Sequence, residues 1–335
     1  MNLEKLKNLL KDEPAFRFKQ IYKAVYGGFA ESWDEITSVP KDLRAKFEKE
    51  IPLKIEHKMF KSSDGTTWKA LIIFDDGSKI EAVLMRHKEG RNTVCVSTQV
   101  GCPMGCDFCA TGKLGLKRNL TADEMTDQVL VFSRILKKEN GRVSNVVFMG
   151  MGEPMLNFDN VMSAIKILND KDGFNIGARK ISISTCGLIE GIKKLAESPL
   201  QVNLAISLHA PNNALRSRIM PVNKTFNIDK LFETLRDYTK KTRNKVMIEY
   251  VLLKGVNDSA KDAKELADLL KKELGKLFMV NMISYNATGT YVSPDPRGIK
   301  VFRGVLEQEG IEVTQRYRLG HDIDGACGQL AAKNA

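Results

Sequence analysis

Residues 102–109 read Cys-Pro-Met-Gly-Cys-Asp-Phe-Cys and place three cysteines in a C-x3-C-x2-C pattern. Three thiolates can hold a [4Fe–4S] cluster in which one iron keeps an open coordination position. A structural zinc site needs four ligands, usually in C-x2-C pairs, and the sequence has no second pair. A disulfide framework is not expected in a chain of 335 residues without an export signal. The pattern therefore favours an iron–sulfur cluster on Cys102, Cys106 and Cys109.

The open iron position has a chemical use. It can bind the amino and carboxylate groups of S-adenosylmethionine (SAM), whose reductive cleavage gives a 5′-deoxyadenosyl radical. The C-x3-C-x2-C run, with the aromatic residue Phe108 before its last cysteine, resembles the signature of radical-SAM enzymes. This resemblance implies that a [4Fe–4S] cluster and SAM are the cofactors.

Length and charge narrow the class of protein. At 335 residues, the chain exceeds the roughly 150 residues of an average domain, which suggests one large domain and a smaller one. Its 52 Lys and Arg outnumber its 41 Asp and Glu, and the net charge of +11 favours a polyanionic partner such as nucleic acid. No apolar stretch follows residues 1–5, and no run approaches the about 20 apolar residues of a membrane helix. We expect a cytoplasmic protein without a membrane contact.

The chain divides near residue 90. In residues 1–52, leucines recur at helical spacing, and Pro40 suits the first turn of a further helix. We expect a helical accessory domain there, whose lysines and arginines either contact RNA or form a solvated charged face. In residues 53–90, short β-rich runs are separated by Asp-Gly turns, a pattern that predicts a β-meander linking this domain to the rest.

Residues 91–335 form the predicted core, in which β-rich runs alternate with amphipathic stretches. The predicted strands cover residues 94–98, 144–150, 180–185, 202–208, 246–253 and 278–284, with 311–317 as a trailing edge strand. The predicted helices cover residues 122–138, 158–169, 188–197, 229–241, 259–273 and 298–309. Six β/α units in succession favour an α/β fold, a TIM-like partial (β/α)6 barrel with the loops after its strands at one rim.

The cysteine run follows the first predicted strand, at the rim where α/β folds bind ligands. Small and polar residues follow the later strands in the same way: Gly152, Glu153, Ser184, Ser207, His209 and Asn286. Glycine lets the backbone approach a ligand closely, and the Glu153 carboxylate can accept a hydrogen bond from the amino group of SAM. Each of these residues alone is more often an ordinary strand-end group, but their recurrence at successive strand ends favours one common site.

Four longer runs carry a closer resemblance. They are CVSTQVGCPMGCDFCATG at 95–112, VVFMGMGEPMLN at 146–157, LAISLHAPN at 204–212 and DIDGACGQL at 322–330. They resemble the RlmN/Cfr family of radical-SAM adenine methyltransferases, and the similarity extends over nearly the whole chain. It implies methylation of an adenine in the peptidyl-transferase region of 23S rRNA, at C2 in the RlmN branch and at C8 in the Cfr branch. The RlmN branch, which residues 153–157 and 208–212 resemble more, also methylates C2 of the adenine just 3′ of the anticodon in some tRNAs.

The resemblance also implies roles for single residues. The family's SAM contacts correspond to Gly152, Glu153, Ser184, Ser207, Leu208, His209 and Asn286. Cys327 corresponds to the thiolate nucleophile that takes a methyl group from a first SAM, and a second SAM supplies the radical that activates this group. Cys95 corresponds to the resolving thiol, which releases methylated RNA by forming a disulfide with Cys327. Glu81, a solvent-facing strand residue by its pattern alone, corresponds to the proton acceptor. Cys186 matches no functional cysteine of the family, and we expect it to be a buried small side chain.

Partners follow from the same resemblance. The target adenine must leave its stack, and a basic rim is expected to hold the RNA phosphates, with Lys113, Lys117, Arg118, Arg216 and Arg218 as candidates. An electron donor such as a flavodoxin would reduce the cluster, and we expect a monomer. Two other classes stay open. A radical-SAM activase or maturase acting on a protein would not need Cys95 and Cys327, and a non-catalytic iron–sulfur RNA-binding protein would leave Glu153 and Cys327 unexplained.

Overall fold

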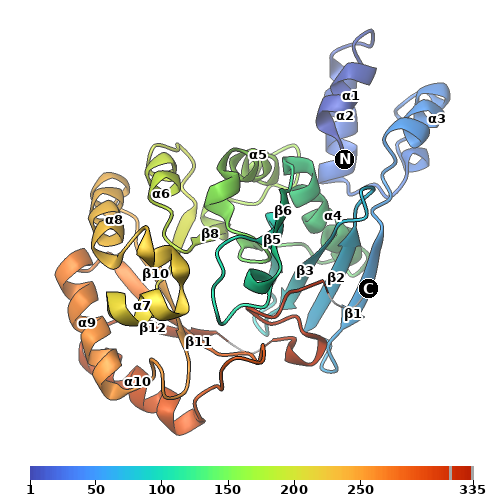
Figure 1. The fold of residues 1–335 in the computed structure, drawn as a ribbon. Coiled ribbons are helices and arrows are strands. Elements are labelled where there is room, and N and C mark those ends of the chain that lie inside the picture. Colours follow the sequence, from blue (N-terminus) through green and yellow to red (C-terminus); the bar gives the residue numbers. More distant parts are fainter. Residues whose placement is uncertain (317–318, 333–335) are drawn as a thin grey trace.

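A mixed sheet runs through the centre of the protein (Figure 1), as seen in a computed structural model that describes residues 1–316 and 319–332. Its strands in spatial order are β1 (His57–Lys61), β2 (Thr67–Ile73), β3 (Lys79–Arg86), β4 (Asn92–Cys95), β7 (Asn145–Phe148), β8 (Ile181–Thr185), β9 (Asn203–Ser207), β10 (Val246–Leu252), β11 (Phe278–Ser284) and β12 (Val313–Arg316). Neighbours from β1 to β4 are antiparallel, and neighbours from β4 to β12 are parallel. The predicted meander and the predicted parallel strands are therefore one continuous sheet.

The parallel strands are joined by six helices that cover the outer face of the curved sheet, as Figure 1 shows. They are α4 (Ala122–Lys138), α5 (Phe158–Asn169), α6 (Ile189–Ala196), α8 (Ile228–Thr242), α9 (Ala260–Leu274) and α10 (Pro296–Gln308). All six agree with the predicted helices to within two residues at either end. Because β4 pairs with β3 and β7 rather than with β12, the barrel stays open, which confirms the predicted partial barrel.

The sequence explains why these elements form. Helix α4 begins with a capping box between Thr121 and Glu124, and its buried face, which includes Val129 and Phe132, packs on the sheet. The parallel strands are buried on both faces, as in β10, where six of the seven residues are buried. The predicted first strand, 94–98, is displaced toward the N-terminus and ends at Cys95. Residue 317, at the end of the predicted trailing strand, lies outside the described residues.

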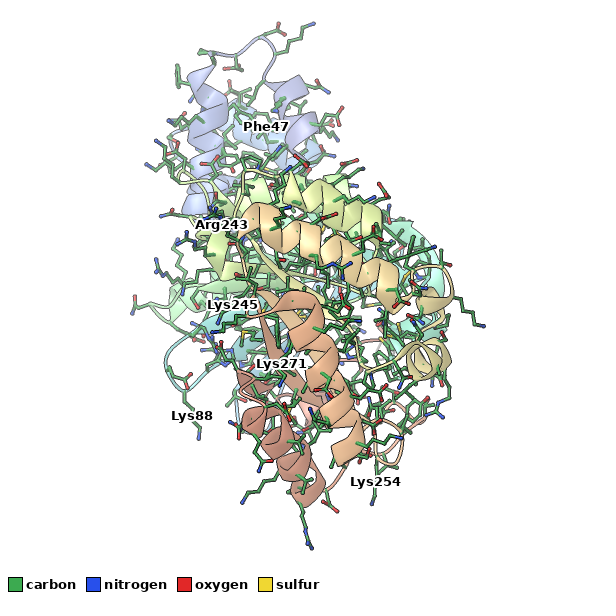
Figure 2. The ribbon with its side chains drawn as sticks, turned by 90° about the vertical axis from the view of Figure 1, so that its left-hand side faces the viewer. Phe47, Lys88, Arg243, Lys245, Lys254 and Lys271 are labelled. Carbon is green, nitrogen blue, oxygen red and sulfur yellow. The ribbon has the colours of Figure 1, made fainter. Side chains whose placement is uncertain are left out.

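The N-terminal residues form a helical module that projects from the barrel (Figure 1), with α1 (Leu3–Leu9), α2 (Phe16–Tyr22) and α3 (Lys41–Glu50). Pro40 directly precedes α3. In Figure 2, Phe47 marks this module above the helices of the outer layer, beside which Arg243 and Lys245 are labelled. The buried Arg134 of α4 ties the module to the barrel, since its guanidinium donates to the carbonyls of Ala30 (2.6 Å) and Leu53 (2.9 Å).

A two-stranded hairpin and a short helix were not anticipated. Strands β5 (Gln99–Cys102) and β6 (Gly115–Asn119) form a hairpin around the cysteine run, and the short helix α7 (Asn213–Ile219) follows β9. The hairpin requires glycine at residue 101, where φ is +82° and an added Cβ would lie 1.9 Å from the carbonyl oxygen of Gly115. Such short elements depend on tertiary packing rather than on a periodic sequence pattern.

Across residues 1–316 and 319–332, no helix combines the length and the apolar character needed to cross a membrane.

Candidate active site

The carboxyl ends of the parallel strands surround a cavity of about 210 Å³. Most of the predicted site residues line it: Cys95, Cys102, Cys106, Cys109, Gly152, Glu153, Ser184, Ser207, His209, Asn286 and Cys327. Leu208 and Glu81, the two other predicted site residues, do not line it. The structure thus brings together residues that lie up to 232 positions apart in the sequence, from Cys95 to Cys327.

The three cysteines of the run lie on one wall of this cavity. Cys102 ends β5, and Cys106 and Cys109 follow in a turn in which the Cys109 amide donates to the carbonyl of Cys106 (3.1 Å). Burial, opposed by a backbone hydrogen bond from Met104, raises the pKa of the Cys102 thiol to about 12, and burial also raises the pKa of Cys106. Each of these pKa values rises further through repulsion from Cys109. A bound metal cation favours the thiolate, because it takes the place of the proton on sulfur.

This donor set fits a [4Fe–4S] cluster, because three cysteines line a common cavity. Polar residues that could bind a small molecule attached to the fourth iron line the same cavity. Cys102, Cys106 and Cys109 would hold the cluster. Over the described ranges, no three His, Cys, Asp or Glu side chains are arranged to hold a single metal ion.

Glu153 lines the same cavity as the cysteines and directly follows Gly152 in the turn after β7. Its buried carboxylate accepts hydrogen bonds from the amides of Met155 (2.9 Å) and Cys186 (2.8 Å), and burial raises its pKa. Each carboxylate oxygen can accept more than one hydrogen bond, so that a ligand ammonium can still bind there. Cys186 is buried, as predicted, and contributes its amide to this arrangement.

Gly152→Ala should destabilise the protein and weaken SAM binding. Gly152 has φ +101°, and an added Cβ would lie 2.8 Å from the backbone nitrogen of Gln99 and 2.6 Å from its Cβ. Backbone strain of this kind costs about 1–3 kcal/mol. Thermal unfolding and equilibrium dialysis with SAM would measure both effects. Gly177→Ala is the matched control, because no atom lies within 4 Å of its added Cβ. Equal SAM binding by the two variants would contradict a close backbone approach at Gly152.

Strands β8 and β9 and the residues after β9 contribute hydroxyl groups and a histidine. The hydroxyls of Ser184 and Ser207 are 3.4 Å apart at the ends of β8 and β9. His209 has φ +59°, and its Nδ1 accepts from the Val251 amide (3.0 Å), which leaves the proton of the neutral ring on Nε2. Burial lowers the pKa of His209 to about 3, so the ring is a neutral hydrogen-bond donor at the cavity wall. Leu208 is buried behind it, and its carbonyl accepts from Arg216 (3.2 Å).

Cys327 and Cys95 come from distant parts of the chain and line the same cavity. Cys327 is exposed within the cavity, and its carbonyl accepts a hydrogen bond from the Asn286 side chain (3.0 Å). Cys95 is the last residue of β4, opposite Val83 of β3. Withdrawal from bulk water raises the pKa of Cys95 to about 12 and also raises the pKa of Cys327, while the nearby Arg316 acts in the opposite direction on both. Arg316 therefore lowers the cost of forming a thiolate at either cysteine, and the thiolate is the nucleophilic form of sulfur.

Arg316 and its partner Glu249 were missed by the sequence reasoning. Arg316 ends β12, lines the cavity and donates to the buried Glu249 carboxylate (2.8 Å), which Asn281 also contacts (2.9 Å). The strand-end rule that found Ser207 and Asn286 applies equally to Arg316, since it lies near the end of the predicted strand 311–317.

Two expectations are corrected by burial. Glu81 is not solvent-facing: its side chain is 2% exposed and forms an ion pair with Lys69 (2.8 Å), because the C-terminal residues cover this face of β3. Arg216 cannot hold RNA phosphates, since it is fully buried and donates to the carbonyls of Cys186 (2.6 Å) and Ser207 (3.2 Å). Arg216 instead links the carboxyl ends of β8 and β9 through these hydrogen bonds.

Known proteins place this fold and site in a class. Residues 96–270 match the Radical SAM superfamily. A radical SAM methyltransferase from Sphaerobacter thermophilus has the same fold, with a TM-score of 0.94 and 42% identity over 99% of this chain and 98% of that one. Fold and site therefore define a radical-SAM methyltransferase.

Closer relatives specify the family. The probable dual-specificity RNA methyltransferase RlmN of Dictyoglomus turgidum is 45% identical over 98% of this chain and 95% of its own length. The protein of the same name from Bacillus pumilus is 45% identical over 99% of this chain and 92% of its own length. The chain belongs to the RlmN family, which confirms the resemblance and sets aside the protein activase and the non-catalytic binding protein.

Proposed function

We propose that this protein methylates C2 of an adenine in the peptidyl-transferase region of 23S rRNA and of the adenine just 3′ of the anticodon in tRNA. The observation that carries the proposal is the presence of Cys327 and Cys95 in the same cavity as the three cluster cysteines. An adenine C2–H is neither acidic nor nucleophilic, so direct attack on a SAM methyl group is not available to it. A protein thiolate can make that attack instead.

In the proposed sequence, Cys327 takes a methyl group from a first SAM, since it is the exposed thiol of the cavity. The cluster and a second SAM, when bound, supply the radical that removes one hydrogen atom from this S-methyl group. Cys327 then presents the activated carbon to C2 of an adenine that has left its stack. After the carbon–carbon bond forms, the C2 proton goes to a base and the one surplus electron would return to the cluster, when bound. The Cys95 thiolate then attacks the sulfur of Cys327. The electron pair of the carbon–sulfur bond goes to the carbon, which takes up a proton and becomes the new methyl group, and a Cys95–Cys327 disulfide remains. Reduction of that disulfide restores both thiols, and an electron donor such as a flavodoxin serves the cluster.

SAM is proposed to contact the residues that line the cavity beside the cluster. Glu153 would accept from the ammonium group of SAM, and Gly152 would let the backbone approach it. Ser184, Ser207 and Asn286 offer hydroxyl and amide groups to its other polar atoms, His209 offers a neutral N–H, and Leu208 contributes only from behind the wall.

The adenine C2 proton needs an acceptor, and the family resemblance assigns this role to Glu81. In the structure its carboxylate is occupied by Lys69 and by the amides of Ala331 and Ala332. Proton removal by Glu81 would therefore require these partners to move.

RNA is proposed to bind the rim around the cavity mouth. Lys117 and Arg218 are exposed, and so is Lys113, which donates to Thr290 Oγ1 (2.9 Å). Arg118 is already paired with Asp76 (2.7 Å) and Glu124 (2.8 Å), which makes it a weaker candidate. Contacts between such cations and phosphates supply affinity that falls as salt rises.

The product identifies the reaction. The anaerobically reconstituted protein, with SAM and a reductant, should convert unmodified 23S rRNA and tRNA fragments to products containing 2-methyladenosine, read by mass spectrometry of nucleosides. If 8-methyladenosine dominates, the methylated carbon is C8 rather than C2, and the proposed roles of the two thiols are unaffected. Methylation of rRNA without tRNA would restrict the substrate range. No methylated nucleoside in either RNA would overturn the proposal.

A further inference from the structure

The residues around Cys327 form a segment, 320–332, that is held from three sides. The β-meander, the cysteine run and the loop after β11 each contribute contacts. They are Ser63 N to Asp322 Oδ2 (2.7 Å), Lys69 Nζ to the Asp324 carbonyl (3.4 Å), Ala110 N to the Gly328 carbonyl (2.8 Å), Thr111 Oγ1 to the Leu330 carbonyl (2.6 Å), Asn286 Nδ2 to the Cys327 carbonyl (3.0 Å), and the amides of Ala331 and Ala332 to Glu81 Oε2 (2.8 and 3.0 Å). We call this stretch the Cys327 segment.

The contacts from Lys69 and Glu81 differ from the others because they come from a buried ion pair. Lys69 lies opposite Val83, and Glu81 lies opposite Leu71, so the two charged residues are diagonal neighbours on one face of β2 and β3. Their side chains are 1% and 2% exposed, and Lys69 Nζ is 2.8 Å from Glu81 Oε1. Burying two charges is costly unless further hydrogen bonds satisfy them. Here those bonds come from the Cys327 segment, on both sides of the cysteine.

Glu81 lies on the face of β3 whose following residues line the cavity, so the ion pair can fix the chain beside the cavity. Successive residues on one face of a strand are two apart, so Glu81 shares its face of β3 with Val83 and Met85. Val83 and Met85 line the cavity, and so does Leu330. The residues directly after Leu330 cover the Glu81 carboxylate. The carboxylate has a cation on one oxygen and two amides on the other, so both oxygens are engaged and the group is placed to anchor the chain that contacts it.

We propose that Lys69 and Glu81 are a positioning pair, which fastens the Cys327 segment to β2 and β3 and thereby holds the sulfur of Cys327 in the cavity. The proposal rests on the proposed function, in which the methyl group on Cys327 must lie where one hydrogen atom can be removed and where the carbon can reach adenine. Its specific content is that Glu81 acts through the segment, with Lys69 as a required partner.

Two variants loosen the same contact from opposite sides. Lys69→Met removes the cation and its contact with the Asp324 carbonyl, and leaves the sequence of the segment unchanged. Ending the chain at Leu330 removes the amides of Ala331 and Ala332 while the ion pair stays. For each variant we would measure S-methylcysteine at residue 327 by peptide mass spectrometry, deoxyadenosine formed, methylated RNA formed, and covalent protein–RNA adduct on a denaturing gel. Iron content and the melting temperature show that each barrel is intact.

We expect both variants to cleave SAM without a matching amount of RNA methylation. Methylated RNA per deoxyadenosine should fall roughly 10- to 100-fold in both variants, because displacement by about 1 Å has effects of this size. No adduct should accumulate. Lys69→Arg keeps the pair and should restore most of the coupling, and Lys245→Met, which removes a cation from an exposed pair with Glu312, should leave it unchanged. A general loss of stability would lower all activities together and would not change this ratio.

Glu81→Gln separates positioning from proton removal. A positioning role predicts the same uncoupling without an adduct. A stalled protein–RNA adduct in Glu81→Gln, with normal coupling in Lys69→Met, would overturn the proposal and make Glu81 the proton acceptor. Normal coupling in both Lys69→Met and the chain ending at Leu330 would overturn it as well. The proposed function is tested in the same assay by Cys327→Ala: RNA methylation by that variant would reject the role of Cys327 itself, whatever the ratios of the other variants.

Discussion

Replacing Cys95 with Ala should trap the protein on its RNA. Methyl transfer to Cys327 and bonding of the activated carbon to adenine do not need Cys95. Release does, because a second thiol must attack the sulfur of Cys327. Both residues line one cavity, and repulsion from Cys327 contributes to the raised pKa of Cys95, so the two sulfurs lie near each other. The variant should therefore accumulate a covalent adduct, seen as a slow band on a denaturing gel that ribonuclease collapses, and turnover should be abolished.

Two further cysteine variants complete this experiment. Cys327→Ala should form neither adduct nor product, because no carbon is loaded onto the protein. Cys186→Ala is the matched control, since this thiol is buried and has no role in the proposed sequence, and it should turn over normally. Full turnover by Cys95→Ala without an adduct would show that another group resolves the intermediate. Cys186 would then be the first candidate, because it also lines the cavity.

Removing any one of Cys102, Cys106 or Cys109 should abolish SAM cleavage. The three cysteines are the thiol ligands that the C-x3-C-x2-C run supplies, and a cluster with only two of them loses an iron ligand. The anaerobic protein should be brown and carry about four irons per chain, and each alanine variant should lose most of this iron. Deoxyadenosine formed from SAM under reducing conditions, together with iron content and the visible spectrum, measures the effect.

The cluster experiment has its own control in the chain. Cys327→Ala leaves the cluster cysteines in place and should retain iron and cleave SAM, although it cannot methylate RNA. Chelation of the iron from the native protein should abolish deoxyadenosine formation in the same way as the cluster variants. Normal deoxyadenosine formation by a variant lacking one of the three cysteines would remove radical-SAM chemistry from this site.

The sequence by itself determined the fold class and the chemical class. The cysteine run is recognisable because its three ligands lie within eight residues, so that spacing alone defines them. The six β/α units were found because each strand and helix repeats its own periodicity over a short stretch. Parallel strands bring their carboxyl ends to one rim, which is why Glu153, Ser184, Ser207 and Asn286 could be assigned to a common site before their distances were known.

Only the tertiary structure decided which charged residues are buried. Glu81 and Arg216 looked like surface residues because strand and helix patterns describe only local exposure. A distant part of the chain covers Glu81, whereas Arg216 is enclosed by nearby loops, such as those of Leu208 and Asn223. Glu81 is covered by the amide of Ala331, 250 residues away, and its partner Lys69 comes from the neighbouring strand. Arg316 became recognisable through Glu249, 67 residues earlier. Spacing in the sequence identifies ligands that are neighbours in the sequence. The partner of a buried charge depends instead on which strands pair and on where the C-terminal segment lies, and only the folded chain brings such partners together.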